Sequence, residues 1–281
     1  MKTRRPSYIH ERMGGQCQPG DIAPYILVPG SEKRVERFAS LWDSARKVAQ
    51  HYEFLVYTGK MGDVPISACS TGCGPRSTSI AVDEMAALGA NTFIRAGVSG
   101  AIQPGLKAGD LIIASGAVRL DRTSEHYVFV EYPATAHYEV IAALAVAAEK
   151  FGYRYHIGIV ASAATFSAGE GSTCFQGYRH SGMDTIESDL RAARVYDWDN
   201  ETATLLTQCS LYGLRAGRIN VIVDDPQTGA YNPMGEEHLV QTALEAIRIL
   251  AAWDQDKSKN GAKYTLPAYP QSKEVKHGNY S

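Results

Sequence analysis

The sequence has almost no excess charge of either sign. Across 281 residues, 28 Lys and Arg face 30 Asp and Glu, which gives a formal net charge of −2 at pH 7. A surface that binds nucleic acid depends on clustered cations that neutralise phosphates. The composition therefore gives no support for a nucleic-acid partner.

Cysteine is scarce, and its spacing suits neither cross-links nor a metal. The five cysteines are Cys17, Cys69, Cys73, Cys174 and Cys209. An odd number without a CxxC pair is a poor disulfide framework, and no second ligand pair accompanies Cys69 and Cys73 to complete a zinc site. We therefore predict no metal and a reducing, cytoplasmic compartment.

Long apolar runs are missing as well. No stretch approaches the roughly 20 residues that a membrane helix needs, so we expect no association with a membrane. The basic start, residues 1–6, has no apolar segment behind it, which argues against a secretory signal. The remaining composition, 44% hydrophobic and 21% charged, is typical of a globular α/β domain.

Short apolar runs alternate with amphipathic stretches along the chain. We expect strands over 25–28, 52–59, 63–70, 91–97, 110–118, 156–164 and 218–223, and helices through Val35 and Phe38 and over 77–88, 137–151, 203–212 and 236–253. This alternation predicts a three-layer α/β/α sandwich with a mixed, twisted central sheet. We expect an N-terminal arm over 1–23, one catalytic domain over 24–256 and a flexible tail over 257–281.

The most informative run is 69–85, CSTGCGPRSTSIAVDEM, in which a strand turns through two glycines into a helix. Glycine lets the backbone approach a ligand closely, and a helix start offers free N–H groups to an anion. The next strand, within 92–104, carries Arg95 among apolar residues. A buried guanidinium is costly without a partner, so Arg95 itself indicates a binding site.

Together these segments resemble the nucleoside phosphorylase superfamily over residues 24–253, and the uridine phosphorylase branch most closely. The resemblance implies a pentosyltransferase that cleaves the N-glycosidic bond of a nucleoside. Phosphate is the co-substrate and no other cofactor is implied. The resemblance also implies a homodimer, or three dimers in a homohexamer, with sites completed across the dimer interface.

The resemblance assigns phosphate binding to Gly30, Arg34 and Arg95, with Ser99 beside the position of a family threonine. A guanidinium can grip two phosphate oxygens at once. For Arg34, an ordinary solvated helix arginine is the alternative. His10 resembles an N-terminal histidine that reaches the sugar 5′-hydroxyl of a partner's site, or it is a solvated residue of the arm.

The segment around Glu201 resembles a Glu-Met-Glu-Ser-Ala motif, whose second glutamate holds the 2′ and 3′ hydroxyls of the sugar. This assigns sugar binding to Glu201, with Asn200 beside it at the nucleoside. An acid at a helix start is also favoured by the helix dipole alone, and this is the alternative.

The base-binding positions differ from the uridine branch. Asp225 stands where purine enzymes of the superfamily carry the acid that protonates the leaving base, and it would need a raised pKa. Phe166 matches an aromatic residue that packs on the nucleoside, or is plain core. Glu170 and Ser172 replace a Gln and an Arg that read uracil. A glutamate that accepts hydrogen bonds suits the N–H groups of a purine.

Three departures affect the phosphate site: Ser31, Tyr52 and Val98 replace an Asp, an Arg and a Thr. Our leading prediction is phosphorolysis of a purine or purine-like nucleoside to the base and ribose 1-phosphate. The alternatives are a nucleosidase that uses water, a uridine phosphorylase-like activity, and a catalytically silent protein that binds a nucleoside.

Overall fold

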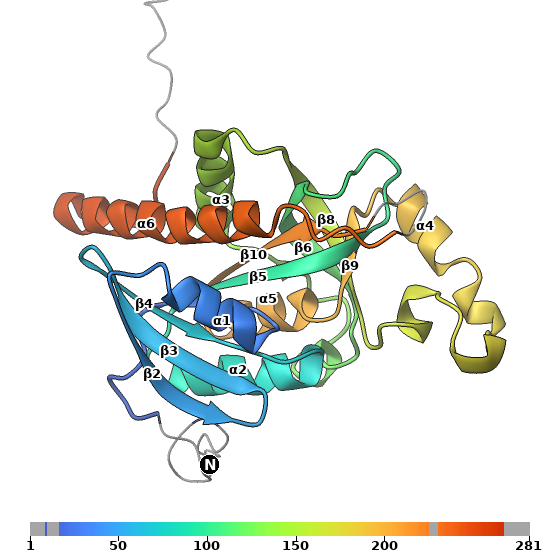
Figure 1. Ribbon diagram of the computed structural model, residues 1–281, viewed down its shortest axis with the longest axis horizontal. Helices are drawn as coiled ribbons and strands as arrows, with labels where there is room; N and C mark the ends of the chain where they lie inside the picture. Colours follow the sequence, from blue (N-terminus) through green and yellow to red (C-terminus); the bar gives the residue numbers. More distant parts are fainter. Residues whose placement is uncertain (1–8, 10–16, 225–229, 267–281) are drawn as a thin grey trace, which may run out of the picture.

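The computed structural model describes residues 9, 17–224 and 230–266 (Figure 1). Its strands are β1 (Tyr25–Leu27), β2 (Ser44–His51), β3 (Phe54–Met61), β4 (Val64–Cys69), β5 (Thr92–Ala101), β6 (Leu111–Leu120), β7 (Ala134–Thr135), β8 (Tyr155–Ala163), β9 (Asp197–Asp199) and β10 (Arg215–Ile222). Its α-helices are α1 (Glu32–Ala39), α2 (Pro75–Ala87), α3 (Tyr138–Phe151), α4 (Ile186–Ala192), α5 (Thr202–Leu211) and α6 (Glu236–Asn260). The predicted α/β alternation and mixed sheet are confirmed, while β2, β7, β9 and α4 were not anticipated.

All strands belong to one mixed sheet in the order β10-β6-β8-β9-β5-β1-β4-β3-β2, with β7 beside β6. β10 also pairs with β5, so β5, β10, β6, β8 and β9 form a closed ring of strands. The neighbours β4, β1, β5 and β10 are mutually parallel. Their carboxyl ends therefore meet at one edge, which is where α/β proteins place their ligands.

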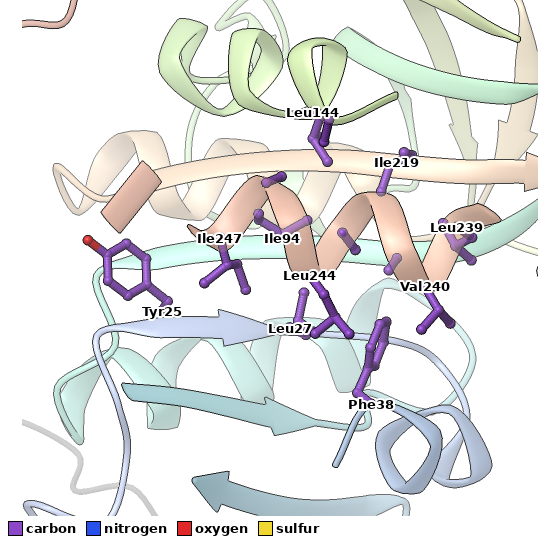
Figure 2. Packing of buried hydrophobic residues seen from close by; sticks show 14 of the residues in the cluster. Tyr25, Leu27, Phe38, Ile94, Leu144, Ile219, Leu239, Val240, Leu244 and Ile247 are labelled. Atoms are coloured by element: carbon purple, nitrogen blue, oxygen red, sulfur yellow. The ribbon is translucent and has the colours of Figure 1, made fainter. Parts of the chain in front are cut away.

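Helices cover both faces of this sheet (Figure 1). On one face, α6 lays an apolar stripe across the strands, as Figure 2 shows. The stripe forms because apolar residues recur three or four positions apart, and it packs on strand residues that are themselves apolar. Its labelled members are Leu239, Val240, Leu244 and Ile247, which lie against Leu27, Ile94 and Ile219. On the other face, α2 and α5 pack with Val82, Met85, Leu205 and Leu206 in the second core cluster.

α6 continues to Asn260, beyond the end at Trp253 that the sequence pattern predicts. Ion pairs explain the extension. Lys257 Nζ lies 2.7 and 2.8 Å from the two oxygens of Glu139, which is buried at the start of α3. Asp254 pairs with Arg215 of β10, whose Nη1 is also 2.9 Å from Glu139. The amide of Thr265 donates to Glu139 at 2.9 Å. The predicted tail boundary at 256 thus falls inside a helix.

We expect this network to make the fold sensitive to acid. Lysine and arginine partners overcome the burial that opposes ionisation, and lower the pKa of Glu139 to about 2 and that of Asp254 to about 2. Folded-state pKa values below the unfolded ones give stability that is present above pH 4.5 and lost as the pH falls toward 2. Urea unfolding of Glu139→Gln at pH 7 should show a loss on the order of 3 kcal/mol.

The same variant should lose less stability than the wild-type protein between pH 5 and pH 3, because the titrating group is gone. Glu187→Gln is the matched control, since its pair with Arg191 is half exposed and such pairs contribute little. Parallel acid sensitivity in wild type and Glu139→Gln would contradict the role of this network.

Candidate active site

The loops after β1 and β4 meet closely at the carboxyl edge. The amide of Thr71 donates to the carbonyl of Pro29 at 2.9 Å. A Cβ added at Gly30 would lie 3.1 Å from the carbonyl oxygen of Gly72, which is tighter than ordinary packing allows. This close approach of two backbones favours glycine at position 30, and the two loops lie beside β5 just past Ile94, which pairs with Leu27 of β1.

The glycine turn in 69–85 positions an acid. Gly74 has φ +110°, a conformation that favours glycine, and it begins α2. Its amide donates to Glu201 Oε1 at 2.7 Å. The anion at the start of α2 is thus the carboxylate of Glu201, a group of the protein itself.

Arg95 lies against the same carboxylate. Its side chain projects from β5, is 5% exposed, and donates through Nη2 to Glu201 Oε2. Its Nε is 3.5 Å from Asp199 Oδ2. Within the described residues, Nε and Nη1 of Arg95 are both buried without a hydrogen-bond partner, and of the two Nε has the ion-pair contact with Asp199. A buried, charged donor that lacks an acceptor is costly, which indicates that an anion completes the site.

Glu201 is itself enclosed, with 4% of its surface exposed. Burial raises the pKa of Glu201, Arg95 opposes this, and the nearby charge of Asp199 adds to it. Its two oxygens are held by the amide of Gly74 and the guanidinium of Arg95. The carboxylate of Glu201 is therefore fixed in place, which is the pre-organisation that a binding group needs.

Glu170 brings a third acid to this group from the loop after β8. Burial, together with the charges of Asp199, Glu201 and Asp224, raises the pKa of Glu170 to about 8, although a hydrogen bond with the side chain of Asn200 opposes the shift. Asn200 also donates to the carbonyl of Ala163 at 2.9 Å. At pH 7 the carboxyl of Glu170 is therefore mostly neutral, able both to donate and to accept.

Asp224 reaches the same edge from the end of β10. Its Oδ1 accepts from the amide of Ala101 at 3.1 Å. Its Oδ2 would lie 3.3 Å from a Cβ built at Gly100. The next residue, Asp225, lies outside the described residues, as does His10. Their predicted roles stay predictions.

The remaining predicted residues have other contacts. Ser99 donates to Asp197 Oδ2 at 2.6 Å. Phe166 is 76% exposed. Ser31 caps α1 by accepting from the amide of Arg34. The guanidinium of Arg34 is bound to Glu236, with Nη2 2.8 Å from Oε1, so a phosphate would compete with this carboxylate for Arg34.

Removal of that competitor gives a test for Arg34. In Glu236→Gln we expect the KM for phosphate to fall about twofold to threefold, because an ion pair whose carboxylate is exposed is worth roughly 0.5 kcal/mol. Steady-state rates with varied phosphate measure it. Glu237→Gln, which frees Arg37 of the same helix from its pair, is the control and should leave KM unchanged. An equal response in the two variants would exclude Arg34 from the site.

The sequence patterns did not single out Asp197, Asp199 and Arg218 as parts of this site. The signal was present: acids recur at 197, 199 and 201, the spacing that puts alternate residues of a strand on one face. Asp199 also accepts from the amide of Thr202, the first residue of α5, at 3.2 Å.

The chain matches the family model described as phosphorylase superfamily over residues 24–252. It is 49% identical over 251 residues to a uridine phosphorylase of Thermococcus kodakarensis, covering 89% of this chain and 91% of that protein. It is 40% identical to the uridine phosphorylase of Escherichia coli K12, covering 81% and 92%. It is 34% identical to a guanosine phosphorylase of Halorubrum lacusprofundi, covering 72% and 78%.

A mixed sheet that holds a buried arginine–glutamate pair at its carboxyl edge fits an enzyme that transfers pentosyl groups. The chain belongs to the phosphorylase superfamily, and it is a nucleoside phosphorylase-type enzyme that uses phosphate as co-substrate. Its similarity to uridine phosphorylases is consistent with that branch of the superfamily. In the described part of the chain, no helix is both long and apolar enough to span a membrane. The same residues hold no cluster of three or more metal-ligating side chains.

Proposed function

We propose that this enzyme cleaves a purine-type nucleoside with phosphate, to give the free base and ribose 1-phosphate. The observation that carries the proposal is the buried guanidinium of Arg95, whose Nη1 has no hydrogen-bond partner among the residues that the structure describes and lies beside the fixed carboxylate of Glu201. An anion at Nη1 would lie next to a sugar whose hydroxyls donate to Glu201. Phosphate and sugar are thereby brought together as an oriented pair.

Charge explains how these residues would promote the reaction. As the glycosidic bond lengthens, the sugar gains positive charge and the base gains negative charge. The carboxylates of Glu201 and Asp199 would stabilise the positive charge on the sugar. Arg95 would hold the phosphate without completely neutralising the negative charge of these two carboxylates. The leaving base needs a proton or a donor, a role that the sequence assigns to Asp225.

Glu170 favours a purine edge. When ionised, a carboxylate accepts from two donors, as the N1–H and the 2-amino group of guanine present them. Uracil offers one N–H between two carbonyl oxygens, which an ionised carboxylate would repel. The similarity to a guanosine phosphorylase supports a purine substrate for a chain of this kind.

Uridine is the second candidate, and two observations favour it. The more similar relatives named above are uridine phosphorylases. In addition, Glu170 is mostly neutral at pH 7, because its pKa is about 8. A neutral carboxyl can pair with an N–H and a neighbouring carbonyl, as a glutamine amide does.

A substrate panel tests both candidates. Guanosine, inosine, adenosine and uridine are incubated with the protein with and without phosphate, and base and sugar products are separated by chromatography. We expect phosphate-dependent release of guanine or hypoxanthine and formation of ribose 1-phosphate. Preferential turnover of uridine would overturn the purine assignment, and free ribose at the same rate without phosphate would show a nucleosidase. Thermal stabilisation by nucleosides without product would indicate a silent binding protein.

We also propose that the protein is at least a dimer, as the resemblance implies. Tyr52, in the turn between β2 and β3, is 71% exposed, and it stands where the family carries a residue that reaches into a neighbouring subunit. Sedimentation velocity should show a dimer or hexamer at assay concentration. A monomer that retains full activity would contradict this proposal.

A further inference from the structure

Two arginines lie directly opposite each other on adjacent strands below the site. Arg95 of β5 and Arg218 of β10 are partners in a parallel ladder, and both side chains are buried, at 5% and 0% exposure. Like charges opposite each other in a sheet repel, and burial removes the water that would screen them. Acids must therefore lie between them.

β9 supplies these acids. Asp197 and Asp199 flank Trp198, so their carboxylates project from the same side of the strand. Arg218 Nη2 is 2.8 Å from Asp197 Oδ2, and its Nε is 3.6 Å from Asp199 Oδ2. Arg95 Nε is 3.5 Å from that same oxygen of Asp199. One carboxylate oxygen is thus shared by the two guanidinium groups.

The charges alternate along a line that leads to the site, in the order Asp197, Arg218, Asp199, Arg95 and Glu201. A neutral donor fixes each acid. These donors are the hydroxyl of Ser99 for Asp197 at 2.6 Å, that of Ser162 for Asp199 at 2.6 Å, and the amide of Gly74 for Glu201 at 2.7 Å. Because the charges are in contact one after another, a displacement of Asp197 or Arg218 changes the electrostatic forces on Arg95.

The central acid depends on both arginines. Burial by itself would raise the pKa of Asp199, but Arg218 and Arg95, with the hydroxyls of Ser162 and Thr202, hold this pKa below its usual value. If Arg218 were absent, Asp197 and Asp199 would face each other with Arg95 as the remaining cation of the line. Arg95 would then be drawn toward them and away from the position of an incoming anion.

We propose that Arg218 is a positioning residue for phosphate binding. It holds Asp199, Asp199 holds Nε of Arg95, and Nη1 of Arg95 is thereby left directed at phosphate. Arg218 is fully buried and acts through Arg95. This inference rests on the proposed function only in taking inorganic phosphate as the anion.

The test uses the full chain with Arg218→Met and with Arg218→Met/Asp197→Asn. Calorimetric titration gives the Kd of inorganic phosphate, steady-state kinetics give KM and kcat, and thermal unfolding gives Tm. Arg218→Met should weaken phosphate roughly tenfold, since small misplacements of a binding group cost that much or more, and it should lower Tm. The double variant removes the acid left unpaired, so we expect it to recover Tm while phosphate stays about fivefold weaker or more.

Recovery of Tm and phosphate Kd together in the double variant would overturn the proposal, because Arg218 would then only neutralise Asp197. An unchanged Kd in Arg218→Met would overturn it as well. If Arg218→Met does not fold, the phosphate Kd of the double variant is compared with that of the wild-type protein, and an unchanged Kd would overturn the proposal. Arg215→Met is the control: it removes an arginine of the same strand from Glu139 and Asp254, and should lower Tm without changing Kd.

The Kd for phosphate needs no turnover. A wild-type protein that binds phosphate but cleaves no nucleoside would therefore count against the proposed function, while the comparison among variants would still decide the role of Arg218.

Discussion

Arg95→Met is expected to lower kcat/KM for phosphate by about 10³-fold, since loss of one preorganised donor to developing charge costs on the order of 10²- to 10³-fold. Arg95 carries the unpartnered Nη1 and also neutralises two buried acids, Asp199 and Glu201. The variant should therefore lose stability too, by about 3 kcal/mol, because it leaves buried acids without their cation. Initial rates with varied phosphate and urea unfolding measure the two effects.

The two losses can be separated. Arg95→Met/Glu201→Gln should recover much of the stability, because it removes one of the acids left without a partner, but it should recover none of the activity. Arg37→Met is the surface control, since Arg37 is half exposed and pairs with Glu237, and it should change neither quantity. Activity of Arg95→Met within about threefold of wild type would remove Arg95 from the phosphate site, because it would fall far short of the loss expected for a preorganised donor.

Base preference is expected to change with pH through Glu170. Its pKa of about 8 means that the carboxyl is mostly neutral below pH 8 and ionised above it. The neutral form pairs with uracil or a purine, whereas the ionised form pairs with two N–H donors and repels the uracil carbonyls. The ratio of kcat/KM for guanosine to that for uridine should rise by roughly tenfold between pH 6.5 and pH 9, since an unpaired buried polar group costs about 1–3 kcal/mol.

Glu170→Gln is the matched variant, because glutamine has the same shape but does not titrate. We expect it to favour uridine and to make the ratio independent of pH. The contribution of Glu170 to folding stability changes with pH in the direction opposite to that of Glu139. A folded-state pKa raised above 4.5 means that the contribution of Glu170 is most favourable at low pH and is lost as the pH rises through 8. A flat ratio in the wild-type protein would show that Glu170 does not contact the base.

The parts of the fold that follow local patterns could be predicted from the sequence. Tyr25–Leu27 is an apolar run and is buried, β10 contains most of the strand expected over 218–223, and the α6 stripe follows helical spacing. β9 could not be found this way, because it has three residues, two of them aspartates that strands disfavour, and it pairs with β5 and β8, which are distant in sequence. β2 was missed because Ser44–Lys47 are all exposed on a strand at the edge of the sheet.

The same division holds for the site. Arg95 could be predicted as a site residue from the sequence, because a charge inside an apolar strand needs a partner. The sugar-binding role of Glu201 was predicted from the resemblance to a family motif. The contacts that hold the site residues in place could not be predicted, because they join positions far apart in the sequence. Examples are the contact of Gly74 with Glu201 and that of Arg34 with Glu236. Such partners depend on strand order, which no local pattern encodes.

The closed ring of strands limits how the site can deform. β5, β8, β9 and β10 each hydrogen-bond to neighbours on both sides, so spreading any two of them apart would break a ladder. The ring of strands anchors Arg95, Arg218 and Asp199. The distances among these three side chains should therefore stay constant through a catalytic cycle. We therefore expect the motion that admits substrate to occur in segments outside the ring of strands, such as the irregular stretch between β8 and α4.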